Sequence, residues 1–228
     1  MAYNFNKIAR AYDRMNHIMT FGLDRLWRRR AVKELSVFNL GLTVLDVACG
    51  TGDMSIELMN FGHCITGIDL SKEMIDIAIK KTEKGEYSFT LYEYQLANAE
   101  ALPFADGEFN AVTCAFGVRN FVNLEQGLNE MLRVIKPGGR MVILELATPD
   151  NKFITPFYNF YTKHVIPCLG GCIAGNRDAY TYLHESITRF PKGESFMKIV
   201  QNSKFKIQNL YQRKFFFGVC RMYVFDKG

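Results

Sequence analysis

The chain has 228 residues, of which 48% are hydrophobic and 22% are charged. This length fits one α/β domain, and this composition excludes intrinsic disorder as a description of the whole chain. The net charge of +5 is too small to indicate nucleic-acid binding. Because no apolar run reaches the roughly 18 residues of a membrane span and the N-terminus is polar, we expect an intracellular, cytoplasmic protein.

Apolar residues recur at helical spacing near the N-terminus. Residues 4–38 are predicted to form two helices that break at Phe21-Gly22, giving a helical cap over residues 1–40. The second helix, Arg25–Lys33, is strongly basic. A solvated helix face explains these charges most simply, and attraction to anionic lipid headgroups is the alternative.

From Leu42 onward, short apolar runs alternate with helical stretches. This alternation predicts βαβ units, and therefore a mostly parallel Rossmann-like sheet with helices on both faces. A terminal pair of strands is predicted to form an antiparallel edge hairpin, which brings the sheet to seven strands. The predicted strands are 43–48, 63–69, 89–96, 109–116, 140–146, 205–211 and 217–225, and the predicted helices are 53–60, 72–84, 124–135 and 193–202.

Residues 151–190 break the alternation with aromatic residues, Gly and Pro. The apolar part of this insertion, 153–166, suits a lid over an apolar substrate, and ordinary core packing is the alternative. The six cysteines include no C-x-x-C pair, and nothing completes a metal site around Cys168 and Cys172. We therefore predict buried free thiols and no bound metal.

The strongest local signal is the segment LDVACGTGD at 45–53, a buried strand followed by a Gly-x-Gly turn and a helix. Small residues in such a turn let a ligand lie against the backbone in the crevice at the ends of the strands. A dinucleotide would need a third glycine, and Asp53 places negative charge where its pyrophosphate would sit. S-adenosylmethionine carries no phosphate, and its two cationic groups favour a nearby carboxylate such as Asp46. The turn therefore favours S-adenosylmethionine, with Gly50 and Gly52 in its binding site.

Polar residues also follow the next two strands. Asp69 ends the second strand and can accept hydrogen bonds from both hydroxyls of a ribose. A plain helix cap is the alternative for Asp69, because Ser71 follows it. Asn98-Ala99 comes after the third strand, where a side-chain amide and a backbone N–H can recognise an adenine edge.

Eight blocks occur in order along the chain: residues 4–16, Trp27-Arg28-Arg29, LDVACGTGD, NAEALPFADGEF, FGVRNF, EMLRVIKPGG, LELATP and YTYLHESITRFP. Together they resemble the menaquinone/ubiquinone C-methyltransferases, a family of class I methyltransferases. The resemblance implies S-adenosylmethionine-dependent C-methylation of a prenylated quinol, first of all demethylmenaquinol. It also implies cofactor contacts by Thr51, Asp69, Asn98 and Ala99, and by Ala115 through its backbone.

Methylating an aromatic carbon requires electron density at that carbon, which a quinol provides best as its phenolate. Arg119-Asn120 follows the fourth strand and is predicted to face the crevice. Because arginine stays charged, Arg119 is expected to stabilise a phenolate or to orient a water that takes the proton. An Arg119 that is simply paired with a local carboxylate is the alternative. The secondary candidates are Tyr12, Asp13, His164, Tyr180 and His184.

The expected partner is the prenylated quinol, whose tail gains about 0.8 kcal/mol for each buried CH₂. Peripheral contact with the inner face of the membrane, through 153–166 and Arg25–Lys33, is an open alternative, as is a homodimer. Two other functions stay open at this point. One is methylation of another lipophilic acceptor, such as a sterol or phenolic metabolite, and the other is a non-catalytic cofactor-binding scaffold in a quinone-synthesis complex.

Overall fold

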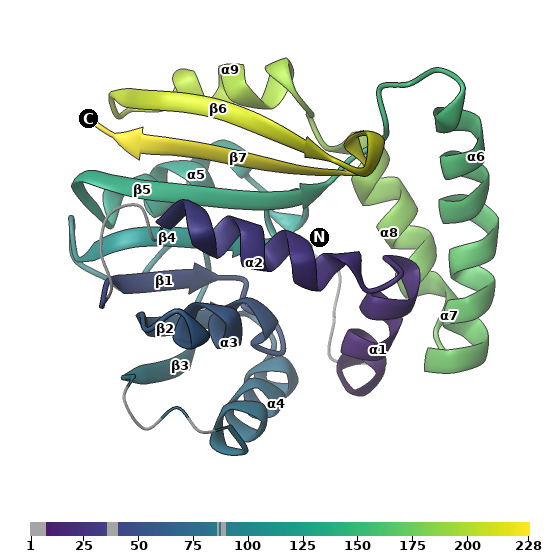
Figure 1. Cartoon of the computed structure of the whole chain (residues 1–228), viewed down its shortest axis with the longest axis horizontal. Helices are drawn as coiled ribbons and strands as arrows, with labels where there is room; N and C mark the ends of the chain where they lie inside the picture. Colours follow the sequence, from purple (N-terminus) through teal and green to yellow (C-terminus); the bar gives the residue numbers. More distant parts are fainter. Residues whose placement is uncertain (1–7, 36–40, 86, 88–89) are drawn as a thin grey trace.

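The computed structural model describes residues 8–35, 41–85, 87 and 90–228. A seven-stranded sheet in the order β3-β2-β1-β4-β5-β7-β6 forms its centre (Figure 1). The first five strands in the chain are parallel, and β7 is antiparallel to both of its neighbours. The predicted mostly parallel sheet is confirmed. The strands are β1 (Thr43–Val47), β2 (Cys64–Asp69), β3 (Tyr92–Leu96), β4 (Phe109–Ala115), β5 (Ile135–Leu146), β6 (Ile207–Phe215) and β7 (Cys220–Lys227).

The strand order reverses at β1. Val44 of this strand pairs with Ile65 of β2 on one side and with Ala111 of β4 on the other. In an open α/β sheet, the chain leaves such a point in opposite directions and opens a crevice beyond the carboxyl ends of the strands. The fold therefore creates its main ligand-binding crevice at β1, β2 and β4.

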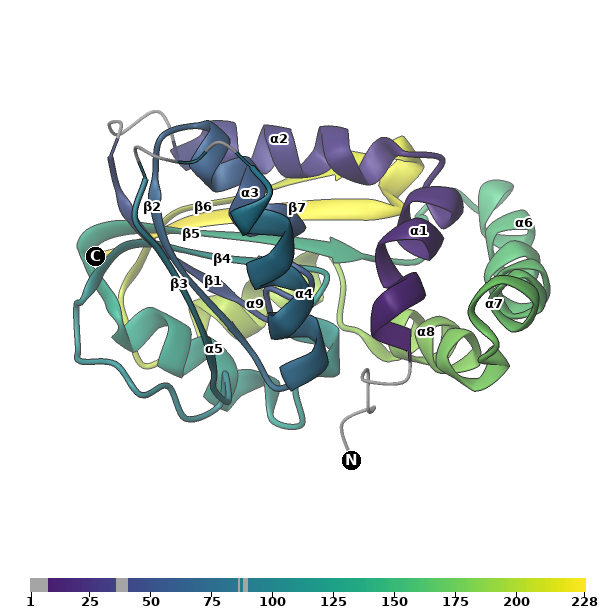
Figure 2. The ribbon, with the colours of Figure 1, turned by 90° about the horizontal axis from the view of Figure 1, so that it is seen from below.

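Helices cover both faces of the sheet, as predicted (Figure 2). On one face, α2 (Leu23–Leu35) packs on β5 and buries Trp27, and α3 (Asp53–Asn60) packs on β2 and α2. On the other face, α5 (Leu124–Arg133) and α9 (Glu194–Gln201) bury Leu128 and Phe196. Near the β3 edge, α4 (Lys72–Glu83) packs on β2 and β3.

A group of helices lies beyond the carboxyl ends of the parallel strands, on the right in Figures 1 and 2. All of them except the helix at 154–160 contribute to a separate apolar cluster that includes Met15, Ile166 and Tyr180. Pro167 lacks the N–H that an α-helix would use, and the chain widens into a π-helical turn just before it. The helices are α1 (Ala9–Met19), α6 (Ile154–Phe160), the π-turn η3 (Tyr161–Val165), α7 (Ile166–Ala174) and α8 (Arg177–Arg189).

Two predicted boundaries in the second half of the sheet are wrong. β5 begins at Ile135 rather than at residue 140, because the sheet continues through Pro137-Gly138-Gly139 as an irregularity in the β4–β5 register. The chain reverses between β6 and β7 at η4 (Phe216–Gly218). The last two residues of this turn were predicted to begin the strand 217–225. Positive φ angles at Phe216 and Phe217 turn the chain there. The predicted residues 4–7, 36–38 and 89 lie outside the described residues.

The cysteine prediction is also partly wrong. All six cysteines are free, but Cys168 and Cys172 are exposed on α7 and Cys64 is half-buried. Cys168 and Cys172 lie four residues apart on a helix, so they share a face, and this face is turned to solvent. Within the described part of the chain, no helix is both long enough and apolar enough to cross a bilayer.

Candidate active site

The turn after β1 is built on left-handed backbone. Gly50 has a φ of 54° and Gly52 a φ of 86°, a region that glycine adopts without steric cost. A Cβ atom at Gly52 would also lie 3.0 Å from the Cβ of Ala78. The Gly50 N–H donates to Asp69 Oδ2 at 2.9 Å, which ties the turn to the end of β2. The Gly-x-Gly signal thus corresponds to a tight turn that is locked to the neighbouring strand.

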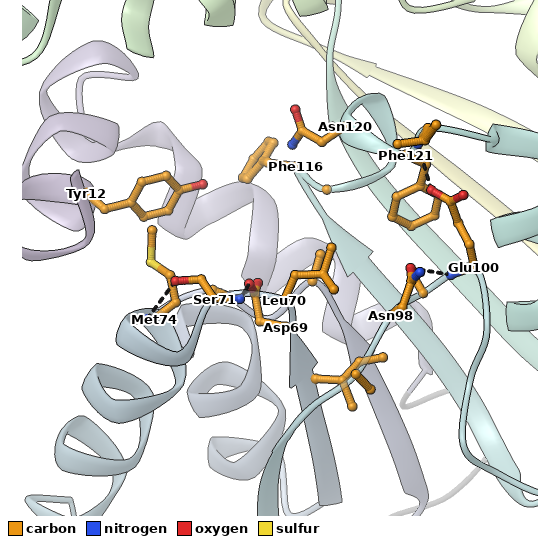
Figure 3. Close-up of a pocket in the computed structure, with 17 residues that line it drawn as sticks. Tyr12, Asp69, Leu70, Ser71, Met74, Asn98, Glu100, Phe116, Asn120 and Phe121 are labelled. Atoms are coloured by element: carbon orange, nitrogen blue, oxygen red, sulfur yellow. Dashed lines mark hydrogen bonds between the residues drawn. The ribbon is translucent and has the colours of Figure 1, made fainter. Parts of the chain in front are cut away.

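A cavity of about 550 Å³ opens beside this turn (Figure 3). Its volume falls in the range of small-molecule sites. Among the predicted cofactor contacts, Gly50, Asp69, Asn98 and Ala99 line it, together with Asn120 of the predicted catalytic pair. The other lining residues are Tyr12, Ala48, Ile68, Leu70, Ser71, Met74, Ala97, Glu100, Phe116, Gly117, Phe121 and Val122.

The charges around this cavity are acidic. Its described lining residues include the carboxylates Asp69 and Glu100 and no lysine or arginine. Asp69 is held by two backbone groups, because its Oδ1 accepts from the Ser71 N–H at 2.9 Å in addition to the Gly50 bond. Burial raises the pKa of Asp69, and these hydrogen bonds partly offset the rise. A cavity with this lining suits a cationic ligand better than a pyrophosphate.

The far wall of the cavity is held by a short chain of hydrogen bonds. Asn98 Oδ1 accepts from the Glu100 N–H at 3.0 Å, and Glu100 Oε1 accepts from the Val122 N–H at 2.7 Å. Figure 3 shows Asn98 and Glu100 across the cavity from Tyr12. The bond uses the carbonyl end of the Asn98 amide, so its NH₂ group remains a donor for a ligand.

Four predicted cofactor contacts lie outside the lining of the main cavity. Asp46 is fully buried and accepts from Ser55 Oγ at 2.6 Å and from Thr113 Oγ1 at 3.0 Å. Burial raises the pKa of Asp46 to about 6. Asp46, Thr51 and Ala115 line a side cavity of only about 20 Å³ behind Gly50, and Gly52 lines neither space.

Asp53, whose negative charge was predicted to disfavour a pyrophosphate, is paired with two cations. Asp53 Oδ1 accepts from Lys81 Nζ at 2.5 Å, and Arg28 Nη2 lies 3.5 Å from its other oxygen, so two cations compensate its charge. These cations more than offset burial and lower the pKa of Asp53.

His17, Asp24 and Asp53 also place metal-ligand atoms within 4.8 Å of one another, but Arg28 is already paired with both carboxylates.

Arg119 lies in the 3₁₀ turn η2 (Val118–Asn120), directly after β4. Its Nη1 donates to Glu145 Oε1 and to the Phe116 carbonyl, each at 2.5 Å, and its backbone N–H donates to Glu145 Oε2 at 3.1 Å. The Arg119 side chain is 5% exposed and Glu145 is fully buried. Burial alone would lower the pKa of Arg119, but Glu145 more than compensates, so the pKa is raised and the guanidinium stays charged. Arg119 Nε is buried and has no hydrogen-bond partner among the described residues.

A second, apolar pocket of about 120 Å³ adjoins the main cavity. Tyr12 and Phe116 line both spaces, and Arg119 lines only the apolar one. From the sequence, Tyr12 was only a secondary candidate. Phe116 was missed. Its positive φ of 62°, just past β4, could not be inferred from its residue type. The remaining lining residues are Asn16, Met19, Thr20, Phe21, Leu23, Asp24, Trp27, Leu146, Tyr158, Tyr161, Thr162, Ile166, Leu183, Ile187, Phe216 and Val219.

The other secondary candidates lie outside both of these spaces. Asp13 accepts from Lys81 Nζ at 2.8 Å and from the Thr51 hydroxyl. His184 Nδ1 lies 2.8 Å from Thr162 Oγ1 in the wall of the apolar pocket. The two remaining candidates are His164, which is exposed, and Tyr180, which is buried in the cluster of the outer helices.

Solved methyltransferase structures share this fold. The chain is similar to an S-adenosylmethionine-dependent methyltransferase from Thermotoga maritima, with a TM-score of 0.66 and 18% identity over 98% of each chain. It is also similar to magnesium protoporphyrin IX methyltransferase from Synechocystis, solved with S-adenosylhomocysteine bound, with a TM-score of 0.63 and 19% identity over 90% of this chain and 83% of that one. At these identities the similarity shows the fold alone.

Sequence relatives are much closer. The chain is 40% identical to the ubiquinone/menaquinone biosynthesis C-methyltransferase UbiE of Geobacter sulfurreducens over 98% of this chain and 87% of the relative. It is 39% identical to the demethylmenaquinone methyltransferase of Bacteroides fragilis over 98% and 90%, respectively. It is 40% identical to that of Thermus thermophilus over 98% and 99%. The model of the ubiE/COQ5 methyltransferase family matches residues 2–227, so the chain belongs to this family and is an S-adenosylmethionine-dependent methyltransferase.

Proposed function

We propose that this enzyme methylates a ring carbon of a prenylated quinol, with demethylmenaquinol as the first candidate acceptor. The main support for this proposal is that two cavities with different chemical linings adjoin each other. An acidic cavity and an apolar, aromatic pocket meet at Tyr12 and Phe116, and Arg119 lies beside the junction. The names of the relatives from Bacteroides fragilis and Thermus thermophilus support the choice of acceptor.

The acidic cavity is the proposed donor site. Asp69 retains lone pairs that can accept from ribose hydroxyls, and Asn98 with the Ala99 N–H can recognise the adenine edge. Asp46, Thr51, Gly52 and Ala115 would act from behind, by shaping the turn that presents the Gly50 backbone. When bound, S-adenosylmethionine supplies an electrophilic methyl group on a sulfonium. The two lining carboxylates, without a described cation, are compatible with that positive charge.

The apolar pocket is the proposed acceptor site. Tyr158 and Tyr161 form its outer wall, and both come from the insertion 151–190 that was predicted to act as a lid. The pocket volume of about 120 Å³ is below the roughly 300–1,000 Å³ of sites for drug-sized ligands, so it cannot enclose a whole prenylated quinol. The quinol ring would therefore lie inside, and most of the prenyl tail would leave through the mouth between Phe21 and Phe216.

Arg119 is the proposed electrostatic partner of the quinol oxygen. Its guanidinium stays protonated, so it cannot act as the base. Its buried Nε has a hydrogen still to donate, which can stabilise the phenolate or orient a water that takes the proton. Glu145 would hold the guanidinium in place. Burial raises the pKa of Tyr12, so its hydroxyl is neutral near pH 7 and can donate to the same oxygen.

The direct test is transfer of a radiolabelled methyl group to demethylmenaquinol, compared with a sterol and a simple phenol. We expect efficient transfer to the quinol alone. Preferred transfer to another acceptor would replace the substrate, and S-adenosylmethionine binding without any transfer would identify a scaffold. In a strain that lacks the protein, mass spectrometry of lipid extracts should show a quinone that is lighter by one CH₂.

A further inference from the structure

Six exposed phenylalanines come from the three chain segments that contribute residues to the lining of the apolar pocket, and we call this set the aromatic rim. Their exposed fractions lie between 57% and 84%, whereas side chains of this type are usually buried. Phe21 and Phe216 line the pocket itself, and Phe21 stacks on Tyr161 with ring centroids 6.2 Å apart. The members of the rim are Phe21, Phe153, Phe157, Phe160, Phe216 and Phe217.

Three members come from one helix that has two different faces. Phe153, Phe157 and Phe160 recur at intervals of four and three residues along α6, so they share its outer face. The inner face of the same segment gives Tyr158 and Tyr161 to the pocket. The pocket and the exposed aromatic surface are therefore separated by the thickness of a single helix.

The other three members are held outward by uncommon backbone conformations. Phe21 has a φ of 53°, Phe216 of 43° and Phe217 of 56°. A positive φ is rare for a bulky side chain and costs free energy, which packing usually repays. Here the three rings remain mostly exposed, so packing within the described chain offsets little of that cost. An external apolar surface would offset it.

The surroundings of the rim are basic. Lys152, Lys163 and Lys214 are exposed within the segments that form the rim. Asp150 lies next to η4, but Lys214 at 2.7 Å and Arg221 at 2.5 Å compensate its charge. The rim-forming segments 17–23, 151–174 and 207–225 contain no aspartate or glutamate.

We propose that the aromatic rim docks on an anionic lipid bilayer, so that a quinol whose tail stays in the membrane can place its ring in the apolar pocket. This inference rests on the proposed function. Aromatic side chains with flanking cations are the combination that binds the headgroup region of an anionic membrane. A second copy of the chain fits less well, because it would bring two basic surfaces together without acidic partners.

The first experiment measures docking itself. Phe157→Trp places a fluorescent probe on the rim, and Leu91→Trp places a matched probe on a residue that is 79% exposed before β3, at the other end of the molecule (Figure 1). With vesicles of phosphatidylglycerol and phosphatidylcholine, the emission of the rim probe should shift to the blue and be quenched by brominated lipid. The emission of the matched probe before β3 should not change. Equal responses from both probes, or no response from the rim probe, would overturn the proposal.

The second experiment removes apolar side chains that lie outside the pocket lining. The triple variant Phe153→Ser, Phe157→Ser, Phe217→Ser should lose at least tenfold in vesicle affinity, and Leu91→Ser should lose none. Turnover of a long-tailed acceptor in vesicles should fall with vesicle affinity, while turnover of a short-tailed, water-dispersed quinol should stay unchanged.

If the wild type methylates neither quinol, the proposed function fails and the docking result still stands. If the triple variant instead converts a dimer to a monomer, with vesicle affinity unchanged, the rim is a self-association surface and the docking proposal is overturned.

Discussion

The two halves of the site are built in different ways. The proposed donor cavity lies on the sheet, at the carboxyl ends of adjacent parallel strands, and hydrogen bonds to backbone N–H groups hold its polar side chains. The proposed acceptor pocket lies between helices that are distant in sequence, and it is lined largely by aromatic and aliphatic side chains. The first half would bind its ligand through a few precisely placed polar groups, and the second would bind by excluding water.

This difference separates the effects that we expect from substitutions. A change in the donor half should alter affinity for S-adenosylmethionine and leave the acceptor chemistry intact. A change at the junction should alter turnover and leave donor affinity intact. If every substitution changed both donor affinity and turnover, this comparison of the two halves would be wrong.

The largest effect is expected at the junction. Arg119→Gln should lower kcat by about 100-fold to 1,000-fold, because it removes the charged donor next to the reacting oxygen, while calorimetric affinity for S-adenosylmethionine stays unchanged. The single variant also leaves Glu145 buried without its cation, which destabilises the fold. The matched control is the double variant Arg119→Gln, Glu145→Gln, which should recover stability without recovering kcat. Normal turnover in either variant would exclude Arg119 from the reaction.

The next prediction concerns a buried carboxyl behind the glycine turn. The pKa of Asp46 is about 6 in the folded chain, above the value of about 4 in an unfolded chain, so the folded state binds the proton more tightly. Its contribution to stability is fully present below about pH 4 and is lost as pH rises through about 6. Asp46→Asn should remove this dependence. Denaturant titrations should show the stability difference, variant minus wild type, growing by about 2 kcal/mol between pH 4 and pH 7; a constant difference would mean that Asp46 has an ordinary pKa.

Asp69→Asn tests the donor half. Loss of the charge-assisted bonds should weaken S-adenosylmethionine binding by about 1–3 kcal/mol. Because the reacting oxygen lies in the other half, kcat at saturating donor should change little. Asp76→Asn is a suitable control, since Asp76 is an exposed carboxylate on the neighbouring helix that pairs with Lys72. Calorimetry that gives equal affinities for the two variants would contradict the ribose role.

The smallest effect is expected at the far wall of the donor cavity. Asn98→Ala should cost about 1 kcal/mol of S-adenosylmethionine affinity, because one hydrogen bond to the adenine edge is lost. An analogue with hypoxanthine in place of adenine should bind the variant and the wild type equally. If the variant weakens both ligands to the same extent, Asn98 supports the loop and does not recognise the base.

The sequence predicted the residues that meet at the ends of the parallel strands, because their signals are local. A strand, a glycine turn and a helix lie within a dozen residues around Gly50, and Asp69 and Asn98 each end a recognisable strand. In a parallel sheet, consecutive strand ends of this kind meet at one edge. The cavity lined by Gly50, Asp69, Asn98 and Ala99 could therefore be anticipated from spacing alone, without any knowledge of the packing.

Features that depend on distant segments could not be predicted in this way. The charge of Asp53 is compensated by Arg28 and Lys81, which lie 25 and 28 residues away, and no local pattern connects the three. Phe116 faces both spaces and has a positive φ. Only glycine makes a positive φ expected from the residue type, so the sequence did not indicate this conformation. The turn at η4 was predicted as strand for the same reason, because an apolar run does not reveal a local reversal of the chain.

The anchoring of α1 has a mechanical consequence for the catalytic cycle. Tyr12 separates the two spaces, and its neighbour Asp13 is fastened to Thr51 in the glycine turn and to Lys81 on α4. A movement of α1 that withdraws Tyr12 must therefore break these contacts at the donor side as well. If the methylated quinol leaves past Tyr12, that movement would also weaken the contacts at the proposed donor site, and release of the two products would be coupled through one helix.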